Sequence, residues 1–165
     1  MHANRATLEK FYNAFALLDA DTMGTFYASD AQFEDEAFSL LGHDQVTSMW
    51  RMLCETTRAK ALADWKLVYS DIEADATNGQ AHWEASYRFI ATKRLVHNEI
   101  DSVFEFNDQG LIVRQRDRFN FWKWSHQALG VPGLLLGWTP FLRNKVRHIA
   151  AANLQKFMAS TRKSI

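Results

Sequence analysis

The hydrophobic period of this chain changes near residue 64, and this change constrains the fold more than any other feature. Upstream, apolar residues recur at three- and four-residue steps, as between Leu8 and Leu18, which indicates amphipathic helices. Downstream the period becomes two, as between Trp65 and Tyr69, which indicates strands. Helices followed by consecutive strands predict an α+β fold in which helices cover one face of a curved antiparallel sheet.

Short turns join the predicted strands into a meander. Asn78-Gly79 is the strongest hairpin signal, because both residues tolerate positive φ. The last strand is predicted from Leu111 to about Phe121, and Pro140 can open a final helix. Because 165 residues are most simply one unit, we expect a single domain over residues 1–165, of which 123–165 form a helical extension.

The charge and cysteine content exclude several classes of protein. Lys plus Arg and Asp plus Glu both number 19, and this balance argues against nucleic acid as a partner. Cys54 is the sole cysteine, so no internal disulfide forms. With neither a signal peptide nor a stretch that could span a bilayer, we expect a soluble cytoplasmic protein. Aromatic residues make up 13% of the chain, an abundance that suits a ligand cavity or a subunit interface.

Two acids are candidates for chemistry. Asp35 closes a short extended run between two helical stretches, and an apolar surrounding there would raise its pKa into the range of a general base. Asp117 alternates in phase with Gln115 and Phe119, and we therefore expect it to be buried with a partner. A loop carboxylate that accepts nearby N–H groups remains the alternative for Asp35, and a structural hydrogen bond the alternative for Asp117.

The order of several motifs resembles the NTF2-like superfamily, particularly its SnoaL-like and ketosteroid-isomerase-like branches. The matching blocks are residues 19–35, Leu41-Gly42 before a helix with Met49-Trp50, residues 104–112 and residues 116–119. The resemblance implies a cone: a strongly curved sheet wrapped by helices, with a pocket for a small hydrophobic molecule in its open end. It also implies a homodimer.

The resemblance assigns roles to individual positions. The base of the ketosteroid isomerases falls on Asp35, whereas their oxyanion tyrosine and aspartate fall on Phe11 and Ser102, with Tyr12 beside the former. Asp117 lies where the limonene-epoxide-hydrolase branch carries one of its aspartates, but the Arg-x-Asp pair of that branch, which should fall near residues 84–86, is missing. The SnoaL-like cyclases need mainly an acid/base carboxylate and a shaped pocket, which this chain offers.

Several aromatic and apolar positions are expected to line the pocket, although core packing explains them as well. These positions are Phe11, Phe15, Met49, Trp50, Trp83, Tyr87, Ser102, Phe104 and Phe119. Tyr12 is the best candidate for a hydroxyl donor, and a core tyrosine is its alternative.

His97, Glu99 and Asp101 share one face of a strand and invite a metal hypothesis. Their phase is opposite to the apolar one, so we place them on the outer sheet surface and expect neither a metal nor an organic cofactor. The segment from Ala128 to His148 is basic and amphipathic, and it carries Trp138 and Phe141. We favour a lid or a packing role for it over membrane contact.

The sequence thus predicts a small NTF2-like protein that binds a hydrophobic ligand, and two functions remain open. One is a cofactor-independent acid/base enzyme of the isomerase, cyclase or hydratase type that uses Asp35, Asp117 and Tyr12. The other is a non-catalytic ligand-binding or dimerisation module.

Overall fold

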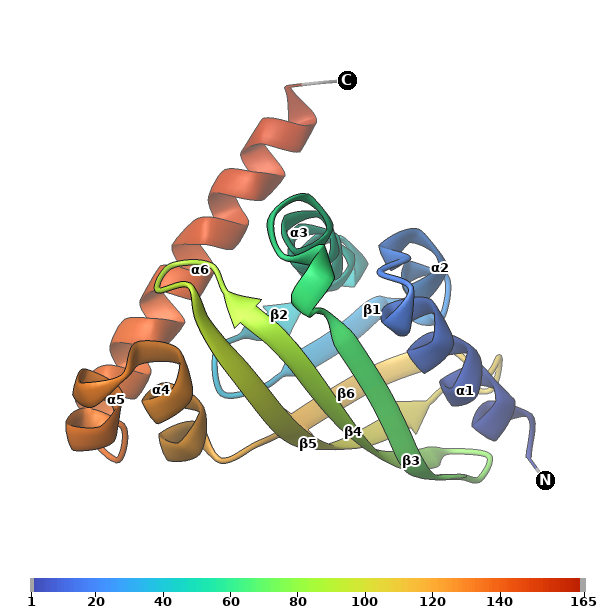
Figure 1. Ribbon diagram of the computed structural model, residues 1–165. Coiled ribbons are helices and arrows are strands. Elements are labelled where there is room, and N and C mark those ends of the chain that lie inside the picture. Colours follow the sequence, from blue (N-terminus) through green and yellow to red (C-terminus); the bar gives the residue numbers. More distant parts are fainter. Residues whose placement is uncertain (1, 164–165) are drawn as a thin grey trace.

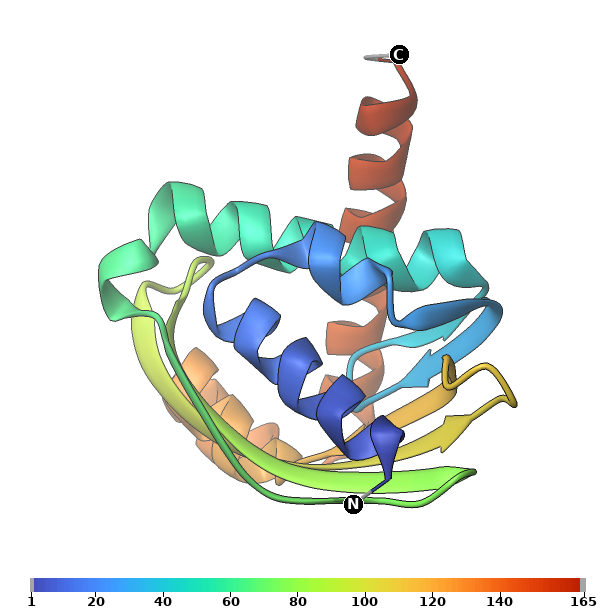
Figure 2. The ribbon, with the colours of Figure 1, turned by 90° about the vertical axis from the view of Figure 1, so that its right-hand side faces the viewer.

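The computed structural model describes residues 2–163, in which a strongly curved sheet wraps around the first helix (Figure 1; Figure 2). The helices are α1 Ala3–Ala16, α2 Ala20–Gly24, α3 His43–Lys60, the 3-10 turn η1 Leu62–Asp64, α4 Phe121–Leu129, α5 Val131–Leu136 and α6 Pro140–Arg162. The strands are β1 Tyr27–Glu34, β2 Ser39–Leu41, β3 Lys66–Ala74, β4 Asn78–Phe89, β5 Arg94–Phe106 and β6 Ile112–Arg118. This arrangement confirms the predicted α+β cone.

The six strands form one sheet in the order β2-β1-β6-β5-β4-β3. Neighbouring strands are antiparallel except for β1 and β6, which pair in parallel because β1 precedes the meander and returns beside its last strand. Side chains along β5 alternate strictly between buried and exposed from Val96 to Phe106. This alternation gives the sheet an apolar concave face and a polar convex face.

The turn between β3 and β4 differs from the predicted one. The Asp75 carboxylate accepts the N–H groups of Thr77 at 2.8 Å and Asn78 at 2.7 Å, so the turn precedes Asn78 and both Asn78 and Gly79 belong to β4. An aspartate that binds the backbone two and three residues ahead competes effectively with an Asn-Gly turn. At Gly79 a Cβ atom would lie 2.9 Å from the Phe106 ring, so its smallness serves packing.

The concave face of the sheet is filled largely by aromatic rings. Phe11 of α1 contacts Tyr12, Trp50 and Phe104 edge to face, with ring centroids 5.2, 5.9 and 6.4 Å apart. Phe15 contacts Trp50 in the same way at 4.9 Å. Such offset and perpendicular pairs add to the stability gained from burial alone. They form a main core between α1, α3 and the sheet.

The chain after β6 covers the open end of the cone. β6 ends at Arg118 and not at Phe121 as predicted, because the Asn120 side chain accepts the Lys123 N–H at 2.9 Å and starts α4. Within α4, the amide of Gln127 accepts the His97 N–H at 2.8 Å and donates to the His97 carbonyl at 3.0 Å. β6 pairs with β5 only from Asp101 onward, and Gln127 thus covers the free edge of β5 before that point.

A second core joins α4 and α6 to the sheet. It consists of Val96, Phe121, Trp124, Ala128 and Leu142. Tyr87 and Phe119 pack against both this cluster and the main core. The last turns of α6 extend beyond the sheet (Figure 2). No helix in residues 2–163 is both long enough and apolar enough to cross a membrane.

Candidate functional site

Asp117 lies on the concave face of the sheet, as its phase in β6 predicted. It is only 4% exposed, while its neighbours Arg116 and Arg118 point outward. One carboxylate oxygen, Oδ1, accepts the Ser102 hydroxyl at 2.6 Å and the Gln115 amide at 2.9 Å. The partner that we expected for this buried acid is therefore a pair of neutral donors and not a cation.

These two donors are themselves the ends of a longer hydrogen-bond network. Trp83 Nε1 donates to the Ser102 hydroxyl at 2.8 Å. On the other side, Trp50 Nε1 donates to the Tyr27 hydroxyl at 2.9 Å, and that hydroxyl donates to the Gln115 side-chain oxygen. An indole N–H can only donate, so each tryptophan fixes the direction of its half of the network. Both halves therefore donate toward Asp117.

Burial raises the pKa of Asp117 to about 7, despite the hydrogen bonds from Ser102 and Gln115, which favour the charged form. The negative charge of Asp35 raises this pKa further. The second oxygen, Oδ2, accepts no hydrogen bond from residues 2–163. Because Oδ1 already accepts two donors, the proton of the neutral acid belongs on Oδ2, where it can be donated or exchanged.

Asp35 lies in the turn between β1 and β2. Its Oδ1 accepts the N–H groups of Ala37 at 2.7 Å and Phe38 at 2.6 Å, and its own N–H donates to the Phe38 carbonyl at 3.0 Å. Burial nevertheless raises the pKa of Asp35 to about 6, and the Arg147 guanidinium only partly opposes this effect. Asp35 thus combines the structural role that we considered as its alternative with a titration near neutrality.

Asp35, Tyr87 and Asp117 form one electrostatic neighbourhood, because the charge of Asp35 acts on both other groups. Asp35 has the lower pKa, so it ionises first and its charge opposes the ionisation of Asp117. Burial and the same charge raise the pKa of Tyr87 to about 12. The Tyr87 hydroxyl accepts the Trp124 Nε1 hydrogen at 2.9 Å, which ties the neighbourhood to α4.

The Tyr12 hydroxyl lies near Ser102, close enough to Asp117 for that carboxylate to influence it. Its pKa is raised well above the usual value, first by burial and then by the Asp117 charge. Tyr12 is 0% exposed, and its hydroxyl makes no hydrogen bond of acceptable geometry with residues 2–163, although the Ser102 hydroxyl lies close enough to influence its pKa. A buried hydroxyl without a partner is uncommon and calls for an explanation.

Most of the predicted pocket positions lie in the packed main core. Phe11, Phe15, Met49, Trp50, Trp83, Ser102 and Phe104 are all buried there. Tyr87 and Phe119 are half-buried at the boundary with the second core. A groove of about 570 Å³ lies instead over outward residues of β4, β5 and β6, including Gln80, Val103 and Arg116, and does not include Asp35 or Asp117.

Sequence reasoning missed two partners of the acids, Gln115 and Arg147, and one further member of the network, Tyr27. Gln115 shares the inward phase of Asp117, and this phase alone could have identified it. Tyr27 lies at the start of β1, and only its contact with Trp50 reveals its role. Arg147 lies more than a hundred residues from Asp35, so that no local pattern joins them.

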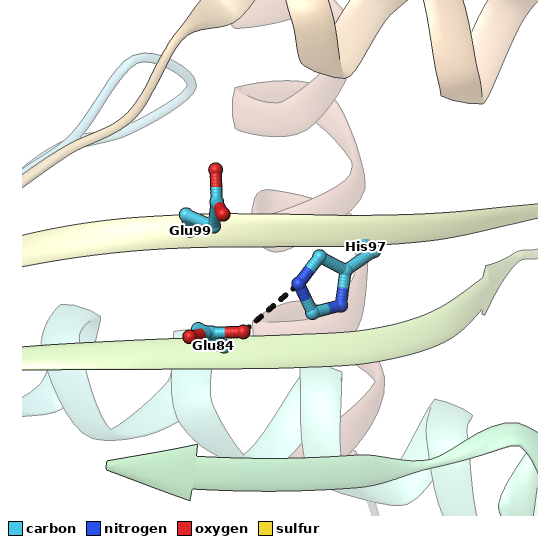
Figure 3. Close-up of side chains that lie close together, drawn as sticks. All are labelled: Glu84, His97 and Glu99. Carbon is cyan, nitrogen blue, oxygen red and sulfur yellow. Dashed lines mark ion pairs between the residues drawn. The ribbon is translucent and has the colours of Figure 1, made fainter. Parts of the chain in front are cut away.

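The outer sheet face carries a charged cluster of Glu84, His97 and Glu99, in which one potential ligand atom from each residue lies within 4.8 Å of the others (Figure 3). His97 Nε2 contacts Glu84 Oε2 at 2.9 Å, and Lys123 Nζ contacts Glu99 Oε2 at 2.7 Å. Glu84 and Glu99 are direct cross-strand neighbours, so the Lys123 ammonium relieves a like-charge pair. We interpret the cluster as a surface ion-pair network.

Asp101 lies outside this cluster and contacts His82 Nδ1 at 2.8 Å. It is exposed, as are His97 and Glu99, which confirms the predicted outward face of β5. The hydrogen bond with Asp101 raises the pKa of His82. Cys54 is buried, and burial raises the pKa of its thiol to about 12, so it is not an activated nucleophile.

Three solved structures share the fold at low sequence identity. A limonene-epoxide-hydrolase-like epoxide hydrolase of Mycobacterium tuberculosis is 21% identical, with a TM-score of 0.61 over 81% of this chain and 95% of its own. A candidate polyketide cyclase of Silicibacter is 20% identical, with a TM-score of 0.61 over 76% and 94%. A ketosteroid-isomerase-like protein of Catenulispora acidiphila, in complex with trimethylamine, is 14% identical, with a TM-score of 0.61 over 81% and 96%.

No curated protein matches the chain. The sequence profile of the SnoaL-like domain matches residues 8–115, from the first turns of α1 into β6. This region contains the cone and Asp35, whereas Asp117 and the helices α4 to α6 lie beyond it. The match spans more than half of the chain, and together with the shared cone it places the chain in the SnoaL-like domain family of the NTF2-like superfamily.

Proposed function

We propose that this protein binds a small hydrophobic carbonyl compound and catalyses proton transfer on it without a cofactor. The observation that carries the proposal is a pair of acids, Asp35 and Asp117, whose pKa values burial raises toward neutrality, with the charge of Asp35 raising the pKa of Asp117 further. Titratable groups whose surroundings separate their pKa values divide the base and acid roles. Asp35 would be the base and Asp117 the acid.

The protonation states at neutral pH support this division. With a pKa of about 6, Asp35 is mostly ionised at pH 7 and can accept a proton. With a pKa of about 7, Asp117 keeps its proton in about half of the molecules and can donate from Oδ2. A base and an acid that both titrate near the working pH give efficient proton transfer in either direction.

The proposed step is an enolisation. Asp35 removes a proton from the carbon next to the carbonyl, and the electrons of that C–H bond form a C=C bond. The π electrons of the carbonyl move to its oxygen, which accepts the hydrogen from Asp117 Oδ2. With a β,γ-unsaturated ketone, Asp35 returns its proton to the γ-carbon of the dienol while the enol O–H returns its proton to Asp117, which restores the carbonyl and gives the conjugated isomer. In a cyclisation, the enol carbon attacks a second carbonyl carbon, the enol O–H returns its proton to Asp117, and the new alkoxide takes the proton held by Asp35.

The unpaired Tyr12 hydroxyl supports a polar ligand atom at this position. It is fully buried, its raised pKa keeps it neutral, and it lies near both Ser102 and Asp117. A ligand oxygen there would accept its hydrogen and satisfy it. Tyr12 and Asp117 would then share the stabilisation of the developing negative charge.

The test measures proton transfer directly and does not require the natural substrate. The apolar ketone 2-tetralone is incubated with the protein in deuterated buffer, and loss of its α-proton signals is followed by NMR. We expect exchange faster than in buffer alone, and Asp35→Asn to slow it by at least about tenfold. Asp30→Asn removes an exposed carboxylate from β1, the strand that leads to Asp35, and serves as the matched control.

Asp117→Asn separates the two roles, because an asparagine can still accept at Oδ1 but has no acidic proton. We expect slower exchange at every pH. The exchange rate should still rise with pH as Asp35 loses its proton. If Asp35→Asn exchanges the probe as fast as the wild-type protein, Asp35 is not the base. If the wild-type protein binds 2-tetralone without accelerating its exchange, the catalytic proposal is wrong.

A second candidate function is a non-catalytic module that stores or senses a hydrophobic molecule. One observation favours it: Asp35 Oδ1 is fully engaged in its turn. Native mass spectrometry of the purified protein tests it through the mass of any molecule that co-purifies, and through the dimer that we also propose. Retention of an apolar molecule by a protein that lacks exchange activity would favour this candidate.

A further inference from the structure

The charges of this chain are divided sharply along its length. All 19 acidic residues lie in residues 1–117, together with 11 Lys and Arg, whereas residues 118–165 hold the other eight Lys and Arg and no acid. The formal charge is therefore −8 for the first part and +8 for the second. A net charge of zero conceals a strongly cationic C-terminal segment.

The same segment exposes a cluster of apolar side chains, which we call the C-terminal tip. The tip consists of Val131, Leu134, Leu135, Leu136, Trp138 and Phe141. Trp138 is 75% exposed, Phe141 70% and Leu135 63%. Elsewhere exposed apolar residues, such as Leu17 and Leu41, stand apart in sequence, as is normal for a protein surface.

The exposure of the tip follows from the way α5 packs on α4. Gly133 and Gly137 share one face of α5 and allow a backbone approach, since a Cβ on Gly133 would lie 1.8 Å from the Ser125 carbonyl oxygen. Trp122 Nε1 and Trp138 Nε1 donate to the carbonyls of Leu134 and Leu135, both at 3.0 Å. The glycines face α4, and the leucine side chains point away from it into solvent. The close packing on α4 holds the backbone of α5 in place.

Cations of α6 accompany the tip. One side of α6 exposes four residues whose spacing places them together, namely Phe141, Lys145, His148 and Lys156. Lys145 and Lys156 form no ion pair with an acid of residues 2–163. One turn from the tip, Arg143 contacts Glu36 at 3.2 Å, and Arg147 lies near Asp35. Figure 1 shows α5 and the start of α6 together at one end of the molecule.

We propose that the C-terminal tip docks on the surface of a bilayer that contains anionic lipids. Exposed Trp, Phe and Leu side chains beside free lysines match the apolar and anionic layers of such a surface. A segment without acids meets no repulsion there. Two tips facing each other would instead oppose like charges, and nucleic acid would leave the leucines in water.

The sequence favoured packing of this segment over membrane contact, and the structure divides the two roles between its parts. Leu142 and Leu154 are buried in the two cores, whereas the tip side chains are exposed and belong to neither core. Docking would also bring Glu36 and Asp35 near the bilayer, through Arg143 and Arg147. The inference does not depend on the chemistry proposed for Asp35.

Co-sedimentation of the full chain with vesicles tests the proposal. We expect binding to vesicles of phosphatidylcholine and phosphatidylserine, at least about tenfold weaker binding to phosphatidylcholine alone, and release at high salt. Combined Trp138→Ala and Phe141→Ala changes, and Lys145→Glu separately, should each weaken binding. Leu41→Ala with Leu62→Ala, and Lys66→Glu, make the same kinds of change at exposed positions of the acidic part.

Circular dichroism confirms that each variant is folded, and analytical ultracentrifugation gives its oligomeric state. Equal binding to both kinds of vesicle, or no binding to either, overturns the proposal. The same holds if tip and control variants bind alike. If the tip variants dissolve a dimer and leave vesicle binding unchanged, the tip is a self-association surface and the proposal is wrong.

Discussion

At the scale of single residues, two tryptophans control the behaviour of a buried acid that neither contacts. Trp50 and Trp83 each begin one half of the network that ends at Asp117 Oδ1. Because an indole offers one donor and no acceptor, the hydroxyls of Tyr27 and Ser102 must turn their hydrogens toward the acid. The network therefore favours the carboxylate, in opposition to burial.

Trp83→Phe keeps an aromatic ring in the core but removes the N–H that polarises Ser102. We expect the pKa of Asp117 to rise, because the Ser102 hydrogen bond to the carboxylate weakens. Trp50→Phe should act in the same direction but less strongly, since Tyr27 and Gln115 intervene. A ¹³C NMR titration of the aspartate carboxyls measures both shifts.

Trp65→Phe is the matched control, because the Trp65 Nε1 hydrogen goes to the Ala16 carbonyl at 2.9 Å, outside the network. It should leave the pKa of Asp117 unchanged while removing a hydrogen bond worth about 1 kcal/mol of stability. If all three variants shift the pKa equally, the effect comes from general loosening of the core. The two indole N–H groups would then not act on Asp117 through the direction of their hydrogen bonds.

Part of this site could be predicted from the sequence. The two-residue period of β6 places Asp117 and Gln115 on the concave face, and the run before Asp35 identifies that acid as a candidate. The donors could not be predicted individually, because Ser102, Tyr27 and Trp83 come from three other strands and meet only through the pairing register. The roles of Asp35, Asp117 and Tyr12 remain predictions.

At the scale of elements, the prediction of helices and strands is correct where one hydrophobic period dominates. It is wrong at element ends where a capping or turn-forming side chain competes with that period. Phe119 and Phe121 continue the alternation of β6, so the strand was extended through them, yet the Asn120 cap ends it. Similarly, the Asp75 side chain displaces the Asn78-Gly79 turn. The parallel pairing of β1 with β6 has no signal in either strand, since orientation depends on the whole chain path.

Gly133→Ala tests how tightly α5 is held on α4. The new methyl group would meet the Ser125 carbonyl carbon at 2.3 Å and oxygen at 1.8 Å, and backbone atoms cannot move aside as a flexible side chain would. We expect a loss of about 1–3 kcal/mol in the free energy of unfolding, as for other overpacked sites. Thermal unfolding followed by circular dichroism measures it.

Leu135→Ala lies on the same helix but on its exposed side, and it should change the stability by no more than about 0.5 kcal/mol. A Gly133→Ala protein as stable as the wild type would mean that α5 can shift away from α4 at little cost. The conclusion that packing on α4 holds α5 and the tip in place would then be wrong.

At the scale of the whole molecule, the buried Asp117 and the half-buried Asp35 make stability depend on pH in an unusual direction. Most carboxylates are stabilised in the folded state, and their proteins lose stability as the pH falls. Here burial raises the folded pKa values of Asp35 and Asp117 to about 6 and about 7, from 3.8. Between these values and 3.8, the folded chain holds protons that the unfolded chain releases, so both acids favour folding below pH 4 and oppose it as the pH rises to 7.

We therefore expect the combined Asp35→Asn and Asp117→Asn protein to gain stability relative to the wild type as the pH rises from 4 to 7. The two pKa shifts correspond to a difference on the order of several kcal/mol, at 1.36 kcal/mol per pKa unit. Urea unfolding at a series of pH values measures the two curves, with Asp30→Asn as the exposed-site control. Curves that stay parallel across this range would mean that both acids titrate normally, and the division of acid and base roles between them would lose its physical basis.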